Sequence, residues 1–219
     1  LWRCDIDPSA LQCPLPEGRQ SPLEYNCSGK HAGMLAVCQQ LNWSLNSYLQ
    51  RNHPVQQLIL GKIAELLRMP GAGEEFISAH DDCGAPTYFM QLGQMASLYA
   101  RLSSGESLDM ERIVRAMTSH PAMVAGDGEF DTELMRLTAG EIVSKAGAEG
   151  VQCIGKVGEG MGLAIKVIDG SKRAKYAAAI YLLRQVGWIS PTVAESLAET
   201  FVTLGKYKRL EVVGELSLP

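Results

Sequence analysis

The spacing of apolar residues predicts helices in the first half of the chain. Met34, Leu35, Val37, Cys38 and Leu41 recur on one face of a helical pattern that spans about 31–49. Pro54 suits the first turn of a second helix, because an amide hydrogen is not needed there. The predicted helices cover about 31–49, 54–69 and 86–102, followed by a short helix that ends at 119 after Ser107-Leu108-Asp109.

The pattern changes after Ile142. Two apolar runs of strand length are joined by a turn that holds Gly155, Gly158, Gly160 and Gly162, which predicts a β-hairpin. Helices over 171–185 and near 193–204 follow, and a final strand is expected over 210–215. This order of helices, hairpin, helix and strand predicts an α+β fold with a helical lobe beside an antiparallel sheet.

Composition limits the classes of partner. The 219 residues are 46% apolar, enough for one substantial core, and we expect a single domain over 1–219. A net charge of -4 with scattered cations provides no basic surface for nucleic acid. The best apolar run, 177–189, contains Arg184 and Gln185 and is shorter than the roughly 20 residues of a membrane span. It predicts a core helix.

Cysteine usage indicates the compartment. Six cysteines without a dense framework favour the reducing cytoplasm, although a bridge between Cys4 and Cys13 stays open. The chain begins Leu1-Trp2-Arg3-Cys4, without an initiator methionine or a signal peptide, in a stretch typical of a structured interior. We therefore expect a fragment of a longer protein.

Two short motifs bring metal-binding chemistry. Asn26-Cys27-Ser28-Gly29-Lys30-His31 places a thiol and an amine three residues apart, and Asp81-Asp82-Cys83-Gly84 holds a second thiol. Thiolates bind Zn²⁺ well, whereas neutralising an ordinary lysine at pH 7 costs about 4 to 5 kcal/mol. Both thiols precede predicted helices, where a thiolate is easier to form. The alternative is that Cys27 and Cys83 are buried apolar residues and Lys30 is a surface charge.

Two lysines are candidates for proton transfer. Lys166 lies between Ile165 and Val167, and an inward orientation would lower the pKa of its amine toward the range of a general base. A solvent-facing orientation on a half-exposed strand satisfies the pattern equally well. Lys145 precedes Ala146-Gly147, small residues that would let a substrate approach a strand edge.

The remaining polar candidates have structural alternatives. Asp81 and Asp82 could orient a metal-bound water or cap a helix, and His31, His80 and His120 could be ligands or ordinary turn residues. The stretch 127–132 lacks the acidic spacing and terminal glutamate of a calcium loop, so it predicts a turn that caps a helix.

Five blocks of sequence together carry a family resemblance. They are Asn-Cys-Ser-Gly-Lys-His-Ala-Gly-Met-Leu at 26–35, His-Pro-Val-Gln-Gln at 53–57, Asp-Asp-Cys-Gly-Ala-Pro-Thr at 81–87, His-Pro-Ala-Met-Val-Ala-Gly at 120–126 and Lys-Ala-Gly-Ala-Glu-Gly-Val at 145–151. With these blocks, most of the chain resembles the rhizobial-type L-asparaginase family, amidohydrolases whose fold is similar to serine β-lactamases and glutaminases. The resemblance implies hydrolysis of L-asparagine with release of ammonia.

The resemblance also implies roles for individual residues. Cys27, Lys30 and Cys83 resemble the zinc ligands of the family, with water completing the shell. Asp81 resembles its site aspartate, Lys166 a strand lysine that pairs with a serine, and Cys153 a reactive cysteine near the site. Lys145 begins a motif similar to the lysine-led strand of serine β-lactamases. The expected catalytic residues are thus Lys166, Asp81, Cys153 and Lys145, and the expected substrate-binding residues are His31 and Glu149.

One family motif is missing. The family carries its nucleophile in an upstream Ser-x-x-Lys motif, and these 219 residues contain no such spacing. We expect the C-terminal two thirds of an amidohydrolase, without its N-terminal strands and serine, paired with the missing segment or with a second copy because a sheet edge would be open. The alternatives are hydrolysis by a metal-activated water, and a zinc-stabilised amide-binding or structural module without catalysis.

Overall fold

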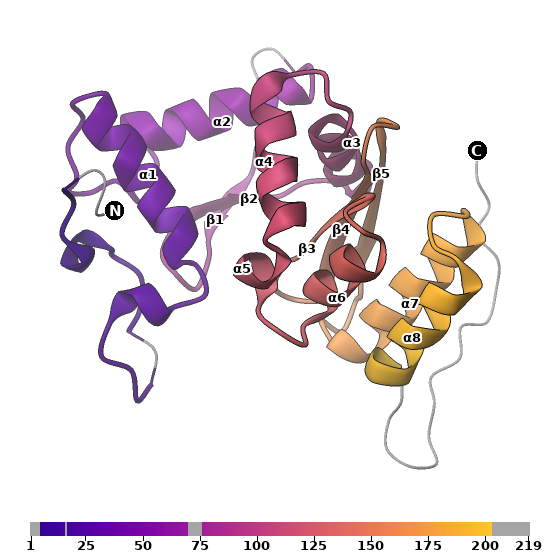
Figure 1. The fold of residues 1–219 in the computed structure, drawn as a ribbon. Helices are drawn as coiled ribbons and strands as arrows, with labels where there is room; N and C mark the ends of the chain where they lie inside the picture. Colours follow the sequence, from indigo (N-terminus) through magenta and orange to yellow (C-terminus); the bar gives the residue numbers. More distant parts are fainter. Residues whose placement is uncertain (1–4, 16, 70–75, 203–219) are drawn as a thin grey trace. The chain divides into compact units, whose positions relative to one another are not determined.

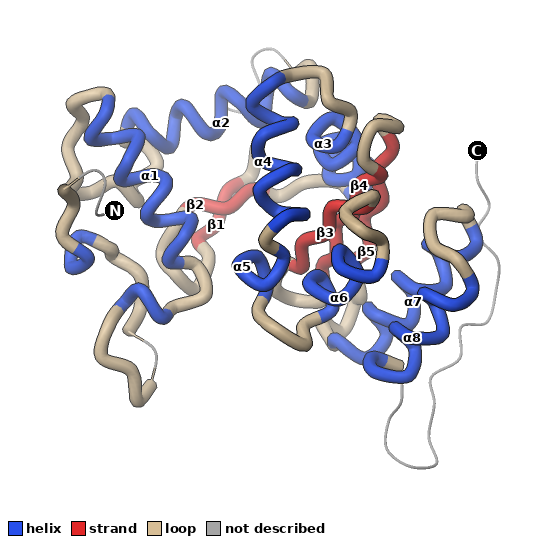
Figure 2. The backbone as a smooth tube through the Cα atoms, viewed as in Figure 1, coloured by secondary structure: helices blue, strands red, loops and turns tan. Residues whose placement is uncertain are grey.

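The computed structural model describes residues 5–15, 17–69 and 76–202 (Figure 1). Contacts divide the chain into two compact units, Leu1–Met90 (unit 1) and Gln91–Pro219 (unit 2). Compact units also occur as lobes of one domain, so the single-domain prediction stays a prediction. Helices and antiparallel strands occur together in the described residues (Figure 2), which confirms the α+β class. The likeness to serine β-lactamases and glutaminases stays a prediction.

The first helix of unit 1 is shorter than its sequence pattern. α1 spans Ser28–Gln40, not about 31–49. Asn42 adopts a left-handed conformation (φ 54°), and the Trp43 amide donates to the Cys38 carbonyl over 2.7 Å. This arrangement ends helices because it satisfies their last carbonyl groups. The apolar pattern beyond it therefore belongs to the loop that packs on the helix.

The second helix begins where proline predicted. α2 spans Pro54–Leu66, and the ring of His53 accepts a hydrogen bond from the Val55 amide. It ends before the predicted residue 69. Two short 3-10 helices, η2 (Pro8–Ala10) and η3 (Pro22–Glu24), precede the α-helices. The main core cluster of unit 1 includes Leu35, Cys38, Tyr48, Val55 and Cys83.

A hairpin replaces the start of the predicted third helix. β1 (Ser78–His80) pairs antiparallel with β2 (Pro86–Tyr88), and the turn between them contains Gly84 at φ 79°. The helix predicted from 86 was therefore wrong at its beginning, since a β-branched and an aromatic residue follow the proline and favour extended backbone. In unit 2, α3 (Leu92–Ser103) begins after Gln91, whose backbone amide donates to the Gln94 side chain.

The sheet of unit 2 has one strand more than the predicted hairpin. Its described strands are ordered β3-β4-β5, and each neighbouring pair is antiparallel. The predicted hairpin corresponds to β4 and β5. The residues from 142 onward form the additional strand β3, and a turn over 147–150 connects β3 to β4. The strands span Ile142–Ala146 (β3), Val151–Lys156 (β4) and Met161–Lys166 (β5).

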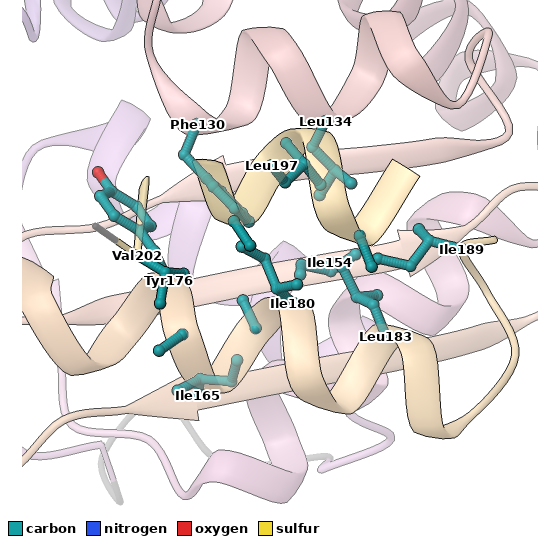
Figure 3. Packing of buried hydrophobic residues seen from close by; sticks show 14 of the residues in the cluster. Phe130, Leu134, Ile154, Ile165, Tyr176, Ile180, Leu183, Ile189, Leu197 and Val202 are labelled. Atoms are coloured by element: carbon teal, nitrogen blue, oxygen red, sulfur yellow. The ribbon is translucent and has the colours of Figure 1, made fainter. Parts of the chain in front are cut away.

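One face of this sheet forms the main core of unit 2. Ile154 and Ile165 point into an apolar cluster with residues from α6, α7 and α8 (Figure 3). The run 177–189, which the sequence predicts to be a core helix, contributes five buried residues to this cluster, and its helical part ends at Gln185. The five are Ala177, Ala179, Ile180, Leu183 and Ile189. These helices span Phe130–Leu137 (α6), Lys172–Gln185 (α7) and Pro191–Phe201 (α8).

The opposite face packs against α3 through glycine. A Cβ atom on Gly162 would lie 2.0 Å from the Ala96 carbonyl oxygen, and one on Gly155 would lie 2.8 Å from the Tyr99 carbonyl oxygen. Such distances are excluded for real side chains. Gly155 and Gly162 therefore serve the contact between helix and sheet, whereas Gly158 and Gly160, with positive φ, make the predicted turn.

The other predicted helices are mostly confirmed. α4 spans Leu108–Ser119, a short α5 (Pro121–Ala125) follows it, and Ser171 caps α7. α8 ends at Phe201, before the predicted 204. The final strand predicted over 210–215 lies outside the described residues, as does Cys4. Across the described helices, none combines the length and apolar character that a membrane span requires.

Candidate metal and catalytic site

An ion pair connects the two cysteine motifs of unit 1. The Nζ atom of Lys30, on the first turn of α1, lies 2.6 Å from Oδ2 of Asp81, in the turn between β1 and β2. Their side chains are 43% and 39% exposed. The hairpin turn holds Asp81 in place because its amide donates to the Ala85 carbonyl over 2.9 Å. Residues 51 positions apart in sequence therefore meet.

Two thiols lie beside this ion pair. Burial raises the pKa of the Cys27 thiol, the Lys30 charge opposes this, and a hydrogen bond with Cys83 raises the pKa further. Cys83 is 1% exposed. Cys27 is the N-cap of α1, as its motif predicted, but Cys83 lies in a hairpin turn. The prediction that a helix N-terminus follows Cys83 was wrong, because the strand β2 begins there instead.

The side chains of Cys27, Lys30 and Cys83 form a zinc-binding set only if the Lys30 amine is neutral. Two sulfur atoms and a nitrogen are ligands that zinc accepts. Burial lowers the pKa of Lys30, but the hydrogen bond and charge of Asp81 outweigh this, so the pKa lies above its ordinary value and the amine must lose a proton before it binds a metal. No described group of three or more His, Cys, Asp and Glu side chains is arranged to hold a metal ion. Zinc at Cys27, Lys30 and Cys83 therefore stays a prediction.

His31 lies beneath the surface of unit 1. Its ring is 0% exposed, and Nδ1 lies 2.5 Å from the hydroxyl of Tyr48, which also accepts the Gln12 amide. The other ring nitrogen, Nε2, is buried without a hydrogen-bond partner among the described residues. Burial lowers the pKa of His31, and the Lys30 charge lowers it further, so the ring is held neutral. No local sequence pattern marks Tyr48 as a partner of His31, because Tyr48 lies in an irregular loop.

Three predicted catalytic residues share the α3 face of the sheet in unit 2. Lys145 lies opposite Cys153 in the β3–β4 register, and Cys153 lies opposite Ala164. Directly opposed residues in antiparallel strands point to the same face, and so do alternate residues of one strand, which adds Lys166. The sheet therefore brings Lys145, Cys153 and Lys166 onto one side.

The two lysines are solvent-facing. Lys166 is exposed, and its Nζ atom donates to the carbonyl groups of Glu149 (2.5 Å) and Val167 (2.6 Å). Of the two orientations that the sequence left open, the structure has the exposed one. Lys145 is exposed as well, and its Nζ atom donates to the Ala146 carbonyl over 2.6 Å. Glu149 is exposed in the turn between β3 and β4, where its φ is 54°.

Cys153 differs from a reactive cysteine. Its side chain is 4% exposed, and burial raises the pKa of its thiol to about 11, with a further contribution from Asp131. At neutral pH the sulfur is therefore protonated. A thiol in this state is a poor nucleophile.

Sequence reasoning missed Asp131. The sequence predicts only a helix-capping turn over 127–132. The turn covers 127–129, whereas residues 130–132 already belong to α6, whose N-cap Glu129 makes no side-chain capping hydrogen bond among the described residues. The Asp131 carboxylate is 2% exposed and accepts hydrogen bonds from the Ser144 hydroxyl (2.6 Å), the Gln152 amide group (2.6 Å) and the Ala146 amide (2.7 Å). An aspartate in the first helical turn is usually a surface residue, so no local signal marks its burial.

The remaining histidine and aspartate candidates are solvent-exposed. His80 and His120 are exposed, and Asp82 is exposed in the hairpin turn. Asp127 pairs with Arg136 over 2.6 Å, which gives its carboxylate a partner other than calcium. Cys13 is a free thiol that donates to the Pro22 carbonyl.

Comparison with known proteins supports the resemblance carried by the sequence blocks. No curated protein matches this chain. A family model described as L-asparaginase II matches residues 1–218. This match extends over nearly all of the 219 residues, so the chain belongs to the L-asparaginase II family.

Proposed function

We propose that this chain is part of an enzyme that hydrolyses L-asparagine to L-aspartate and ammonia. The family match over 1–218 supports amidohydrolase chemistry on a small molecule. The observation that carries the proposal within the structure is the meeting of Cys27, Lys30, Cys83 and Asp81, because side chains from two separate motifs of the resemblance converge there.

Cys27, Lys30 and Cys83 are the proposed holders of a zinc ion. Zinc bound there would act as a Lewis acid toward an amide carbonyl. Asp81 is the proposed orienting residue, since its Oδ2 atom is 2.6 Å from the Lys30 amine. His31, which is buried beside these residues, would support them through the Tyr48 hydrogen bond. Its Nε2 atom has no hydrogen-bond partner among the described residues, and a role in substrate binding would act through this atom.

Lys166 and Lys145 are the proposed proton carriers. Both amines are exposed and positioned by backbone carbonyl groups, and departure of ammonia requires a proton donor. Cys153, with its protonated thiol, would be a neutral neighbour on the same face. Glu149 contributes the carbonyl group that holds Lys166, and its exposed carboxylate is proposed to bind the substrate. Because Ser-x-x-Lys does not occur in the 219 residues, we propose that the serine nucleophile lies outside them.

The proposed setting is cytoplasmic. Free thiols at Cys13, Cys27, Cys38, Cys83 and Cys153 are typical of a reducing compartment. The proposed partners are a second copy of the chain or the segment that supplies the serine. Nucleic acid is not proposed, because the net charge is -4.

The second candidate is a zinc-stabilised module that binds an amide without hydrolysing it. The buried, protonated thiol of Cys153, a poor nucleophile, favours this alternative. It retains the metal group of unit 1 and gives the lysines of unit 2 no catalytic role.

A test begins with the protein expressed from its complete reading frame. Ammonia release from L-asparagine and L-glutamine would be measured in parallel with zinc content. We expect turnover of L-asparagine, a loss of about 100-fold or more in kcat with Lys166→Met, and loss of zinc with Cys27→Ser. Cys38→Ala, a buried cysteine of the same helix, is the matched control and should retain both. Binding of L-asparagine without ammonia release would favour the module, and retained stoichiometric zinc in Cys27→Ser would overturn the metal assignment.

A further inference from the structure

We propose that Asp131 is a positioning residue that fixes the end of β3 and thereby orients Lys145. The inference rests on the proposed function, in which Lys145 carries a proton. Asp131 is the second residue of α6, and its carboxylate is 2% exposed. It contacts β3 directly through the backbone amide of Ala146, the residue that follows Lys145.

Strand pairing explains why this amide is available. The Gly147 amide donates to the Val151 carbonyl on β4 over 2.9 Å. Amides alternate in direction along a strand, so the Ala146 amide points away from β4. Within the described sheet β3 is an outer strand, and no neighbouring strand there receives this amide. Oδ2 of Asp131 accepts it over 2.7 Å, in the position that a further strand would otherwise occupy.

The other oxygen of Asp131 connects the carboxylate to both β3 and β4. Oδ1 accepts from the Ser144 hydroxyl and from the Gln152 side-chain amide, each over 2.6 Å. A buried carboxylate is costly unless its lone pairs have donors, and three donors supply them here. The carboxylate is therefore held in one orientation. Because it accepts the Ala146 amide, it holds that amide in place as well.

Ala146 is also held through its carbonyl group, by Lys145. The Lys145 Nζ atom donates to the Ala146 carbonyl over 2.6 Å. The amide and carbonyl groups of Ala146 thus connect the buried Asp131 carboxylate to the exposed Lys145 amine. Movement of this residue would displace the amine, and a displacement of about 1 Å can lower a catalytic rate about 100-fold.

Two variants separate positioning from general stability. Asp131→Asn keeps the shape of the side chain but replaces one accepting oxygen with a donor. In the place of Oδ2 this nitrogen deprives only the Ala146 amide of its acceptor, whereas in the place of Oδ1 it would face the donors of both Ser144 and Gln152, so the first orientation is favoured. Ser144→Ala is the matched control. It removes a donor to Oδ1 and leaves the contact between Oδ2 and Ala146 in place. Both changes weaken the same buried network, but only the first alters the contact that matters for Lys145.

The test uses the complete enzyme and two measurements. With Asp131→Asn we expect kcat for L-asparagine to fall about 10- to 100-fold with KM within about 3-fold, while Ser144→Ala keeps kcat within about 3-fold. Amide hydrogen exchange at Ala146 should be at least about 10-fold faster in Asp131→Asn than in wild type, and unchanged in Ser144→Ala. Asp131→Ala removes both accepting oxygens, so amide exchange at Ala146 should be faster in this variant as well.

The outcomes are distinct. Equal losses of kcat in the two variants would mean a merely structural role and would overturn the proposal, as would unchanged exchange at Ala146 in both Asp131 variants. Faster exchange without a change in kcat would also overturn it. If the wild-type enzyme releases no ammonia, the proposed function fails, whereas the exchange measurement still decides whether Asp131 holds the strand end.

Discussion

The candidate residues of unit 1 and unit 2 are supported by different kinds of structure. In unit 1, a helix N-terminus and a hairpin turn bring Cys27, Lys30, Asp81 and Cys83 together. Cys27 is the N-cap of α1 and Lys30 lies in its first turn, whereas Asp81 and Cys83 lie in the turn between β1 and β2. In unit 2, Lys145 and Cys153 are opposed residues of a regular sheet, packed closely against α3. A side chain at the end of an element can change with little effect on the fold. A residue within the sheet cannot, because its neighbours are fixed by register and packing.

The largest effect is expected where α3 meets the sheet. Gly162→Ala would place a methyl group 2.0 Å from the Ala96 carbonyl oxygen, so helix and strand must separate. We expect a loss of about 3 kcal/mol or more in the free energy of unfolding. The measurement is denaturant unfolding of purified wild type and variant.

A glycine of the same helix provides the control. A methyl group on Gly93 would meet nothing within 4 Å, so Gly93→Ala should leave stability unchanged or raise it by up to about 1 kcal/mol through helix propensity. Equal stability of the two variants would mean that α3 does not approach β5 as closely as described.

The second effect concerns the proposed zinc ligands of unit 1, among which Cys83 is also a buried core residue. Cys83→Ser removes one sulfur donor, so we expect zinc affinity to fall by about 100-fold or more, beyond the 10- to 100-fold typical of losing an outer partner. Competition with a chelating dye measures the affinity, and circular dichroism monitors the fold. An unchanged affinity would remove Cys83 from the ligand set and weaken the contrast between the units.

The sequence predicted elements well where the pattern was local. Pro54 and Ser171 marked helix starts correctly because a proline in the first turn and a serine cap act through their immediate neighbours. The pattern from 31 to 49 failed at Asn42, where one residue with positive φ ended the helix despite continued apolar spacing. Pro86 was ambiguous, since proline begins strands as well as helices, and the pairing with β1 decided between them.

The site was predicted as residue types but not as contacts. Cys27 and Lys30 are near each other on one helical turn, which spacing alone indicates. The meeting of Lys30 with Asp81 depends on how α1 and the hairpin pack, which no local pattern contains. Asp131 was missed for the same reason, because its donors come from β3 and β4. Its burial follows from the packing of α6 on the sheet, not from its own neighbours in sequence.

A third effect tests the chemistry of the sheet. Because the pKa of Cys153 is about 11 and its side chain is 4% exposed, alkylation at pH 8 should be about 100-fold slower than that of a small free thiol. Mass spectrometry after timed exposure of the native protein to iodoacetamide measures the rate, with the denatured protein as control. Modification at the rate of a free thiol would restore the expectation of a reactive cysteine, and the sheet of unit 2 would then resemble unit 1 in accessibility.

The smallest effect is an increase in stability at Lys175. This lysine of α7 is 1% exposed, and its Nζ atom has a weak contact with the Val151 carbonyl at 3.4 Å and lies 4.9 Å from the centre of the Tyr176 ring. Burial lowers the pKa of its amine. The charge of Asp131 opposes this shift, and Lys172 and Lys145 add to it. A lowered pKa means that the folded protein holds the ammonium group less well than the unfolded chain does, even with the attraction of Asp131 included.

Replacing the charge while keeping the length should therefore stabilise the protein. We expect Lys175→Met to raise the free energy of unfolding at pH 7 by about 1 to 2 kcal/mol, whereas the exposed Lys172→Met should change it by less than about 0.5 kcal/mol. The cost of the buried charge is fully present below the folded pKa and is relieved as pH rises from that value toward the ordinary 10.5, so the advantage of Lys175→Met should shrink between pH 7 and pH 10. Urea unfolding at both pH values measures this difference. A loss of stability at pH 7 would show that the ammonium group compensates Asp131, and that the carboxylate which holds β3 depends on a buried ion pair as well as on its three hydrogen-bond donors.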